Sequence, residues 1–121
     1  MTKKIMVVDD ERSLLELMNA ILGSAGYNVT TASSGEECLK KLKTEKPDLI
    51  LLDMMMPGMS GRETAANIRK NSETKELKIA FLTVAKFSES GKGILITMNI
   101  LDYITKPFDN EDLLKRVKKI I

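Results

Sequence analysis

Short apolar runs alternate with amphipathic helical patterns five times along this chain. The apolar runs predict strands near residues 4–9, 28–32, 48–53, 78–83 and 101–105. The helical patterns fall near residues 11–25, 35–46, 61–71, 88–98 and 110–120. Regular alternation of strand and helix predicts an α/β fold, a doubly wound five-stranded parallel sheet with helices on both faces.

Apolar stripes and capping residues support the predicted helices. The stripe of the first helix consists of Leu14, Met18, Ile21, Leu22 and Ala25. Gly26 supplies a stop for this helix, Ser34 opens the second, and Pro47 closes the second. The last helix is expected to begin at Asp109, with its apolar residues facing inward.

Length and composition limit the class of protein. The 121 residues suffice for one core, and we expect residues 1–121 to form a single domain. Charged residues make up 30% and hydrophobic residues 43%, which is typical of a folded globular protein. The net charge of +2, with both signs interleaved, gives no reason to expect direct binding of nucleic acid or membrane.

The chain is expected to be cytoplasmic. No apolar run is long enough to span a membrane, and no signal peptide is recognisable. The single cysteine, Cys38, fits a reducing compartment and shares a helical face with Leu42, which favours a packing role.

Histidine is absent from the sequence. This absence excludes a histidine-based catalytic triad, histidine-ligated zinc and an internal phosphohistidine. Any chemistry must therefore use carboxylates, hydroxyls, lysine and backbone groups.

Charged side chains follow three of the predicted strands where each strand ends: Asp9, Asp10, Asp53 and Lys106. Doubly wound sheets of five strands commonly have the order 2-1-3-4-5, which places the first and third strands side by side. The three aspartates should then meet at one edge of the sheet, with Lys106 delivered to the same edge. Carboxylates packed this closely need positive charge among them, and their hard oxygen atoms suit Mg²⁺.

Simpler explanations remain open for the single residues. Asp10 or Glu11 could cap the first helix, and Lys106 alone could be a solvated lysine. Asp53 is less easily a cap, because the next helical pattern starts only near Gly61. The joint placement of these residues favours a cation and phosphate site.

Four segments together resemble the receiver domain of two-component response regulators, the CheY-like family. They are Val7–Glu11, Leu51–Met59, Leu82–Thr83 and Asp102–Phe108, in this order and suitably spaced. The resemblance covers essentially the whole chain, and it implies a CheY-like (flavodoxin-like) (βα)5 fold with the strand order given above.

The resemblance implies a role for each residue at the sheet edge. Asp53 would accept a phosphoryl group from a partner histidine kinase or phosphotransfer protein. Mg²⁺, or Mn²⁺ or Ca²⁺ in its place, would be held by Asp9, Asp10, Asp53 and the backbone carbonyl of Met55. Thr83 and Lys106 would contact phosphoryl oxygens. The chain would not be an enzyme toward other molecules, because it would catalyse only its own phosphorylation and dephosphorylation.

The resemblance also implies a switch. Thr83 and Tyr103 would be switch residues, and the bond between Lys106 and Pro107 would be cis. The face formed by the fourth helix, the fifth strand and the fifth helix would signal to a downstream protein or a fused output domain. A homodimer that depends on phosphorylation is a further expected partner state.

Several positions depart from the family pattern. Val84 stands where alanine is usual, so access to the phosphate could be narrowed. Met55 and Ala85 replace polar residues at positions that influence phosphate lifetime, which predicts slow loss of phosphate. Asn99 could provide a left-handed cap before the fifth strand.

The fourth helical pattern is the weakest. Gly91 and Gly93 each cost about 1 kcal/mol relative to alanine in a helix interior, so we expect this segment to be short, frayed or mobile. Exposed apolar residues among Ile94, Leu95 and Ile96 would mark a partner or dimer surface.

The run Met54–Met56 could suggest a soft-metal site. Without cysteine or histidine nearby, we instead expect a loop that packs under the fold.

Two other classes of protein share parts of the pattern. A phosphatase with an aspartate nucleophile would carry a second acid two residues after it, but position 55 is methionine. A flavodoxin-like FMN binder would need a phosphate-cradling loop after the first strand, where this chain has Asp9–Arg12.

Overall fold

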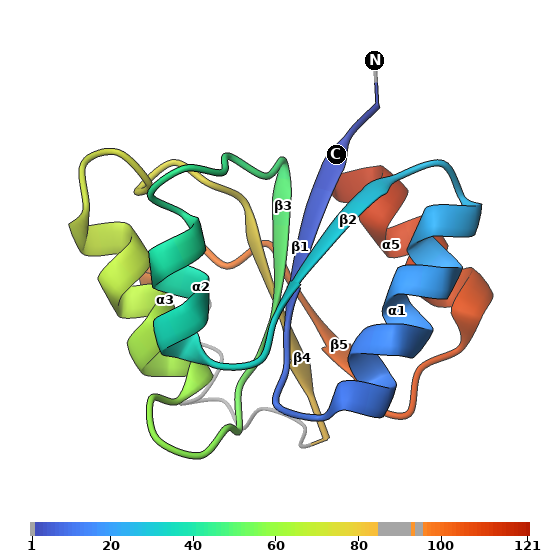
Figure 1. Cartoon of the computed structure of the whole chain (residues 1–121), viewed down its shortest axis with the longest axis horizontal. Helices are drawn as coiled ribbons and strands as arrows, with labels where there is room; N and C mark the ends of the chain where they lie inside the picture. The colour runs from blue at the N-terminus through green and yellow to red at the C-terminus, as the bar shows by residue number, and fades with distance from the viewer. Residues whose placement is uncertain (1, 85–92, 94–95) are drawn as a thin grey trace.

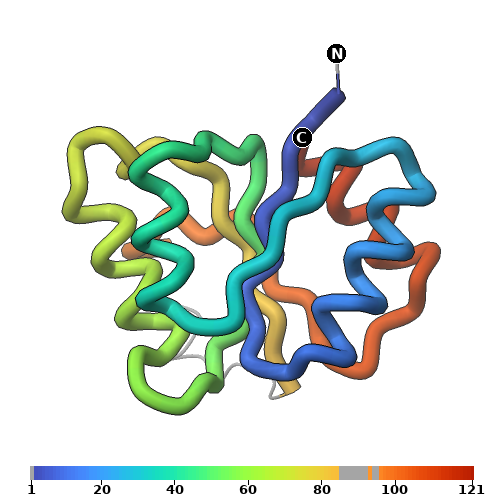
Figure 2. Tube along the Cα trace, in the orientation of Figure 1, coloured from blue at the N-terminus to red at the C-terminus, as the bar shows by residue number. Residues whose placement is uncertain are grey.

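The computed structural model of the chain describes residues 2–84, 93 and 96–121, and they form one five-stranded sheet. All neighbouring strands are parallel, and their order is β2-β1-β3-β4-β5, as the sequence predicted. The strands are β1 Lys4–Val8, β2 Asn28–Ala32, β3 Leu49–Asp53, β4 Ile79–Thr83 and β5 Asp102–Thr105. In this order β1 lies between β2 and β3, as the Cα trace in Figure 2 shows.

Helices cover both faces of the sheet. They are α1 Arg12–Ser24, α2 Gly35–Lys41, α3 Gly61–Lys70 and α5 Asn110–Ile120. Figure 1 shows α1 and α5 together on one side of the sheet and α2 and α3 on the other. The helix predicted over 88–98 lies largely outside the described residues, and so do the predictions of its softness and of exposed Ile94 and Leu95. Ile96 is described, and 83% of it is exposed.

Alternate strand residues build two apolar layers. Met6 and Val8 of β1 pack with residues of α2 and α3, whereas Ile5 and Val7 pack with residues of α1 and α5. Every residue of β3 and β4 is buried. Burial on both faces explains why these strands are continuous apolar runs rather than alternating ones.

The apolar stripe of α1 differs from the predicted one. Leu15, Met18 and Leu22 are the buried residues of the helix. Ala25 is exposed because it is the C-cap residue, beyond the last turn of the helix. Gly26 then adopts a positive φ of 97°, which confirms the predicted stop.

Helix α2 ends earlier than predicted. Ser34 caps its start by accepting a hydrogen bond from the amide of Glu37, as expected. At the other end, the amides of Lys43 and Thr44 bond to carbonyls three residues earlier, which tightens the chain into a turn. The prediction of a helix up to residue 46 was therefore wrong by several residues.

Arg69, near the end of α3, forms hydrogen bonds with the two backbone segments that precede β4 and β5. Its guanidinium donates hydrogen bonds of 2.6 to 3.2 Å to the backbone carbonyls of Lys75, Leu77, Met98 and Asn99. Asn99 has a φ of 54°, as predicted for a left-handed cap. These bonds join α3 to the segments that enter β4 and β5.

None of the helices in the described part of the chain has the length and apolar character needed to cross a membrane.

Candidate functional site

Three carboxylates meet at the carboxyl edge of the sheet, the lower edge in Figure 1. Val8 of β1 pairs with Leu52 of β3, so Asp9 and Asp53 lie one residue further along adjacent parallel strands. Carboxylate oxygens of Asp9, Asp10 and Asp53 all lie within 4.8 Å of one another. Asp9 is fully buried and Asp53 is 5% exposed, whereas Asp10 is exposed and opens the cluster to solvent.

Lys106 brings a positive charge into this cluster. Its Nζ donates a hydrogen bond to Asp9 Oδ2 at 2.6 Å and lies 3.6 Å from Asp53 Oδ2. Lys106 follows the last residue of β5, and its amide donates a hydrogen bond to the Thr83 carbonyl at 2.7 Å. This backbone bond fixes the position of Lys106 at the edge of the sheet. The following bond to Pro107 is cis, as predicted.

The electrostatics of the cluster favour a bound cation. Burial raises the pKa of Asp53, and the charges of Asp9 and Asp10 raise it further. The hydrogen bond from the Met55 amide and the charge of Lys106 lower this pKa without cancelling the rise. Burial by itself would lower the pKa of Lys106, but its contacts with Asp9 and Asp53 outweigh burial and raise it. A lysine that stays charged among three acids leaves the cluster with excess negative charge.

Backbone amides hold two of the carboxylates. The Glu11 amide donates to Asp9 Oδ1 at 2.9 Å, and the Met55 amide donates to Asp53 Oδ1 at 3.2 Å. Glu11 is the N-cap residue of α1, but its side chain makes no capping bond within the described residues. Asp10 is therefore available to the acidic cluster and is not the cap.

Gly61 is a site residue that the sequence analysis missed. A Cβ atom at this position would lie 2.2 Å from the Asp53 carbonyl oxygen and 2.6 Å from Met54 Cα. The Gly61 amide also donates to the Met54 carbonyl at 3.0 Å. Only glycine allows the start of α3 to approach the loop after Asp53 this closely, and a tertiary contact of this kind leaves no local signal beyond the glycine itself.

The three methionines after Asp53 behave differently from one another. Met54 and Met56 pack against the core layer that faces α2 and α3, as predicted. Met55 does not, because 66% of it is exposed. The expectation that the whole loop packs under the fold was therefore wrong for Met55.

The two predicted switch residues lie on neighbouring strands. Thr83 ends β4, is only 2% exposed, and lies one residue beyond the Leu82 that pairs with Asp53. Tyr103 pairs with Phe81, is half-buried, and packs against the layer that contains α3. Val84 follows Thr83 and is 65% exposed. Ala85 lies outside the described residues.

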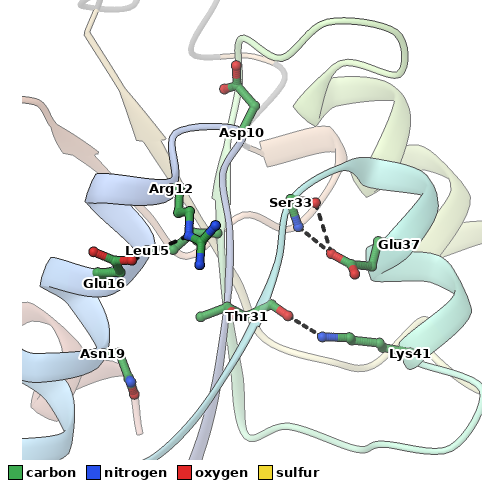
Figure 3. A pocket seen from close by; sticks show the side chains of 9 residues that line it. All are labelled: Asp10, Arg12, Leu15, Glu16, Asn19, Thr31, Ser33, Glu37 and Lys41. Carbon is green, nitrogen blue, oxygen red and sulfur yellow. Dashed lines mark hydrogen bonds and ion pairs between the residues drawn. The ribbon is translucent and has the colours of Figure 1, made fainter.

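A groove of about 410 Å³ lies beside the cluster, between α1, β2 and α2 (Figure 3). Many of its polar groups bond to one another: Lys41 donates to the Thr31 carbonyl, and Arg12 pairs with Glu16 at 3.4 Å. Asp10 stands at one end, and its carboxylate points away from the Arg12 guanidinium. The groove therefore adjoins the acidic cluster through Asp10, while its Arg12 guanidinium pairs with Glu16.

Replacing Asp53 by asparagine is expected to raise the melting temperature in metal-free buffer by about 4 °C, the shift that about 1 kcal/mol produces in a domain of this size. The substitution removes a buried charge that two acids repel, while Lys106 keeps its partner Asp9. Thermal unfolding followed by circular dichroism measures the change. A clear drop in melting temperature would contradict the prediction.

The size of this stabilisation by Asp53→Asn depends on pH. A raised pKa means that the folded chain holds the proton of Asp53 more tightly than the unfolded chain does. The cost of ionising Asp53 is absent below the ordinary carboxyl range, sets in as pH rises through the raised pKa, and is complete above it. The gain from Asp53→Asn should accordingly be small in acid and largest near neutral pH.

Comparisons with known proteins identify the family. A family model described as "Response regulator receiver domain" matches residues 5–118. The chain is 44% identical over 121 residues to the alkaline phosphatase synthesis transcriptional regulatory protein PhoP of Bacillus subtilis, covering 100% of this chain and 49% of that protein. The chain thus spans about half the length of this curated relative.

Solved structures agree. Chemotaxis protein CheY4 of Vibrio cholerae superposes with a TM-score of 0.93 at 32% identity, covering 100% of both chains. Response regulator TrrA of Thermotoga maritima, solved in complex with Mg²⁺-BeF, has a TM-score of 0.84 at 39% identity, covering 99% of this chain and 100% of that one. Fold, sequence and acidic edge agree: the chain belongs to the receiver domains of two-component response regulators and has their CheY-like fold.

Proposed function

We propose that Asp53 accepts a phosphoryl group from a phosphohistidine of a partner histidine kinase or phosphotransfer protein, in a reaction that requires Mg²⁺. The observation that carries this proposal is the convergence of three carboxylates within 4.8 Å beside the ammonium group of Lys106. Phosphoryl transfer depends chiefly on alignment and on positive charge around the transferring oxygens. This sheet edge supplies a carboxylate nucleophile and a cation in contact with it.

The donor atoms of the cluster fit a hard divalent cation. Carboxylate oxygens are the ligands that Mg²⁺ prefers, and solvent-exposed Asp10 leaves room for water ligands. In our proposal Asp9, Asp10, Asp53 and the Met55 carbonyl hold Mg²⁺, or Mn²⁺ or Ca²⁺ in its place. The bound cation would supply positive charge to offset the carboxylates and an incoming phosphoryl group. The Mg²⁺-BeF complex of TrrA supports this assignment.

The chain's own residues prepare the nucleophile. Asp53 Oδ1 accepts the Met55 amide and Asp53 Oδ2 faces Lys106, so both oxygens of the carboxylate are oriented. The carboxyl group of an aspartate is ordinarily ionised near neutral pH, so no general base is needed. The new bond joins an Asp53 oxygen to phosphorus while the bond from phosphorus to the donor histidine nitrogen breaks, and the electron pair stays on that nitrogen.

The transferred group would then change the contacts at the edge. Lys106 would share its ammonium between Asp9 and a phosphoryl oxygen, and the Thr83 hydroxyl would contact a second oxygen. Both residues lie where strands end, so their movement would pull on the loops after β4 and β5. Tyr103, half-buried on β5, would turn with this switch and alter the face of the chain that carries β5 and α5.

The signal is expected to pass to other domains. We propose that residues 1–121 act as one receiver domain and that the phosphorylated face engages a downstream protein, a fused output domain or a second copy of the chain. The match to half of PhoP, a transcriptional regulatory protein, supports an output domain as one of these partners. The chemistry of the chain would be limited to gaining and losing its own phosphoryl group.

The test is incubation with Mg²⁺ and acetyl phosphate, followed by the mass of the intact protein. We expect one added phosphoryl group, no addition in the presence of a chelator, and no addition to Asp53→Asn. Asp48→Asn is the matched control, because Asp48 precedes the same strand at its opposite end and accepts a hydrogen bond from the Lys4 amide. Phosphorylation retained in Asp53→Asn, or lost in Asp48→Asn alone, would overturn the assignment.

A further inference from the structure

Met55 stands out from the other methionines of the chain. It is 66% exposed, whereas Met56 is 8% exposed and Met54 is half-buried. Among all methionines that the structure describes, Met55 is the only exposed one. Three consecutive thioethers of identical chemistry therefore differ sharply in their access to a dissolved reagent.

Met55 is also fixed beside the proposed phosphoacceptor. Its amide donates a hydrogen bond to Asp53 Oδ1 at 3.2 Å, so the residue starts at the rim of the acidic cluster. Met54 is held on the protein side of the loop, because its carbonyl accepts the Gly61 amide and its amide donates to the Leu82 carbonyl. A chemical change on Met55 would thus occur at the mouth of the site rather than in the core.

We propose that Met55 is a site of oxidation by hydrogen peroxide, and that its sulfoxide shortens the lifetime of a phosphoryl group on Asp53; the second half rests on the function proposed above. The sulfur loses two electrons and gains one oxygen atom from the peroxide, which leaves as water. Oxidation of a methionine requires access of the oxidant to its side chain, and residue exposure singles out Met55 among the three.

Faster hydrolysis of the phosphoryl group is expected because the sulfoxide is more polar than the thioether. A thioether is a weak acceptor and cannot orient a water molecule, whereas a sulfoxide oxygen is a strong acceptor. An acceptor beside an acyl phosphate can take a hydrogen bond from an attacking water and align it with phosphorus. Oxidised Met55 would therefore assist hydrolysis from a position where the native side chain is an exposed thioether.

Cys38 does not compete for the oxidant. It is fully buried, and burial raises the pKa of its thiol to about 12. The thiolate is the reactive form of cysteine, so this thiol stays protonated and unreactive at neutral pH. Peroxide treatment of the folded chain should accordingly modify methionine sulfur first.

Oxidation itself is tested by limited treatment of the folded protein with hydrogen peroxide, followed by fragmentation of the peptide that carries residues 54–56. We expect sulfoxide to form on Met55 on the order of tenfold faster than on Met54 or Met56. Comparable rates at the three positions would overturn the proposal. This result does not depend on phosphorylation, so it is informative even if the chain takes up no phosphoryl group.

The consequence is tested by comparing each protein with itself, before and after peroxide. Protein phosphorylated with acetyl phosphate is freed of the donor, and the loss of phosphoryl mass is followed over time. We expect peroxide to shorten the half-life about threefold in the native chain, the modest effect of one added acceptor on an attacking water.

Two variants assign the effect. Met54→Leu should retain the peroxide effect, and Met55→Leu should lose it. An unchanged half-life in oxidised native protein, or an effect that persists in Met55→Leu, would overturn the proposal. If the untreated native chain took up no phosphoryl group, the function proposed above would be refuted. The peptide fragmentation after peroxide treatment would still decide whether Met55 is the oxidised residue.

Discussion

Replacing Lys106 by methionine is expected to lower the free energy of unfolding by about 3 kcal/mol in metal-free buffer at neutral pH. The substitution keeps a long apolar stem but removes the cation that lies 2.6 Å from fully buried Asp9 and 3.6 Å from Asp53. Two carboxylates then remain in the fold without their positive partner, and removing one partner of a buried ion pair costs more than the pair contributes. Urea unfolding measured by circular dichroism gives the change.

Three comparisons make this prediction specific. Lys118→Met, an exposed lysine of α5, should change stability by no more than about 0.5 kcal/mol. The double variant Asp9→Asn with Lys106→Met should be less destabilised than Lys106→Met alone, because one of the two uncompensated charges is gone. Addition of Mg²⁺ should restore part of the lost stability, since a cation in the acidic cluster replaces the missing charge. Equal losses for Lys106→Met and Lys118→Met would contradict the proposed role of the cluster.

The sheet and the acidic edge could be predicted because they depend on patterns that local sequence carries. Residues of β3 and β4 are buried on both faces, and such strands leave continuous apolar runs whose ends are easy to place. Once two such runs are assigned to neighbouring parallel strands, the residues after them must meet at one edge. Asp9, Asp53 and Lys106 were brought together in this way, and the structure places them within hydrogen-bonding or ion-pair distance.

The errors concern features that tertiary contacts decide. Helical periodicity fixed the presence of α1 but not its boundary, so Ala25 was counted in the stripe and Leu15 was missed. The loop Met54–Met56 was predicted to pack as one apolar unit. Its middle residue, Met55, instead exposes its side chain to solvent, and the Met55 amide donates a hydrogen bond to the Asp53 carboxylate. Gly61 is required because the backbone of Asp53 and Met54 lies against it in the folded chain, a contact that local sequence does not reveal.

Gly61→Ala is expected to destabilise the chain by about 3 kcal/mol and to slow phosphoryl uptake by Asp53. The added methyl group would lie 2.2 Å from the Asp53 carbonyl oxygen and 2.6 Å from Met54 Cα, both backbone atoms that cannot rotate away. Relief requires a shift of α3 or of the loop after β3, and that loop holds the Met55 amide against the Asp53 carboxylate. The same strain should therefore appear in stability and in the rate of phosphorylation by acetyl phosphate.

Gly23→Ala provides the opposite result from the same chemical change. Gly23 lies in α1, and a Cβ atom there would meet nothing within 4 Å. Alanine is favoured over glycine in a helix by about 1 kcal/mol, so this variant should be more stable than the native chain and should be phosphorylated normally. If Gly61→Ala were as stable as Gly23→Ala, the start of α3 would have to lie further from Asp53, and the fixed geometry of the phosphoacceptor would lose its structural basis.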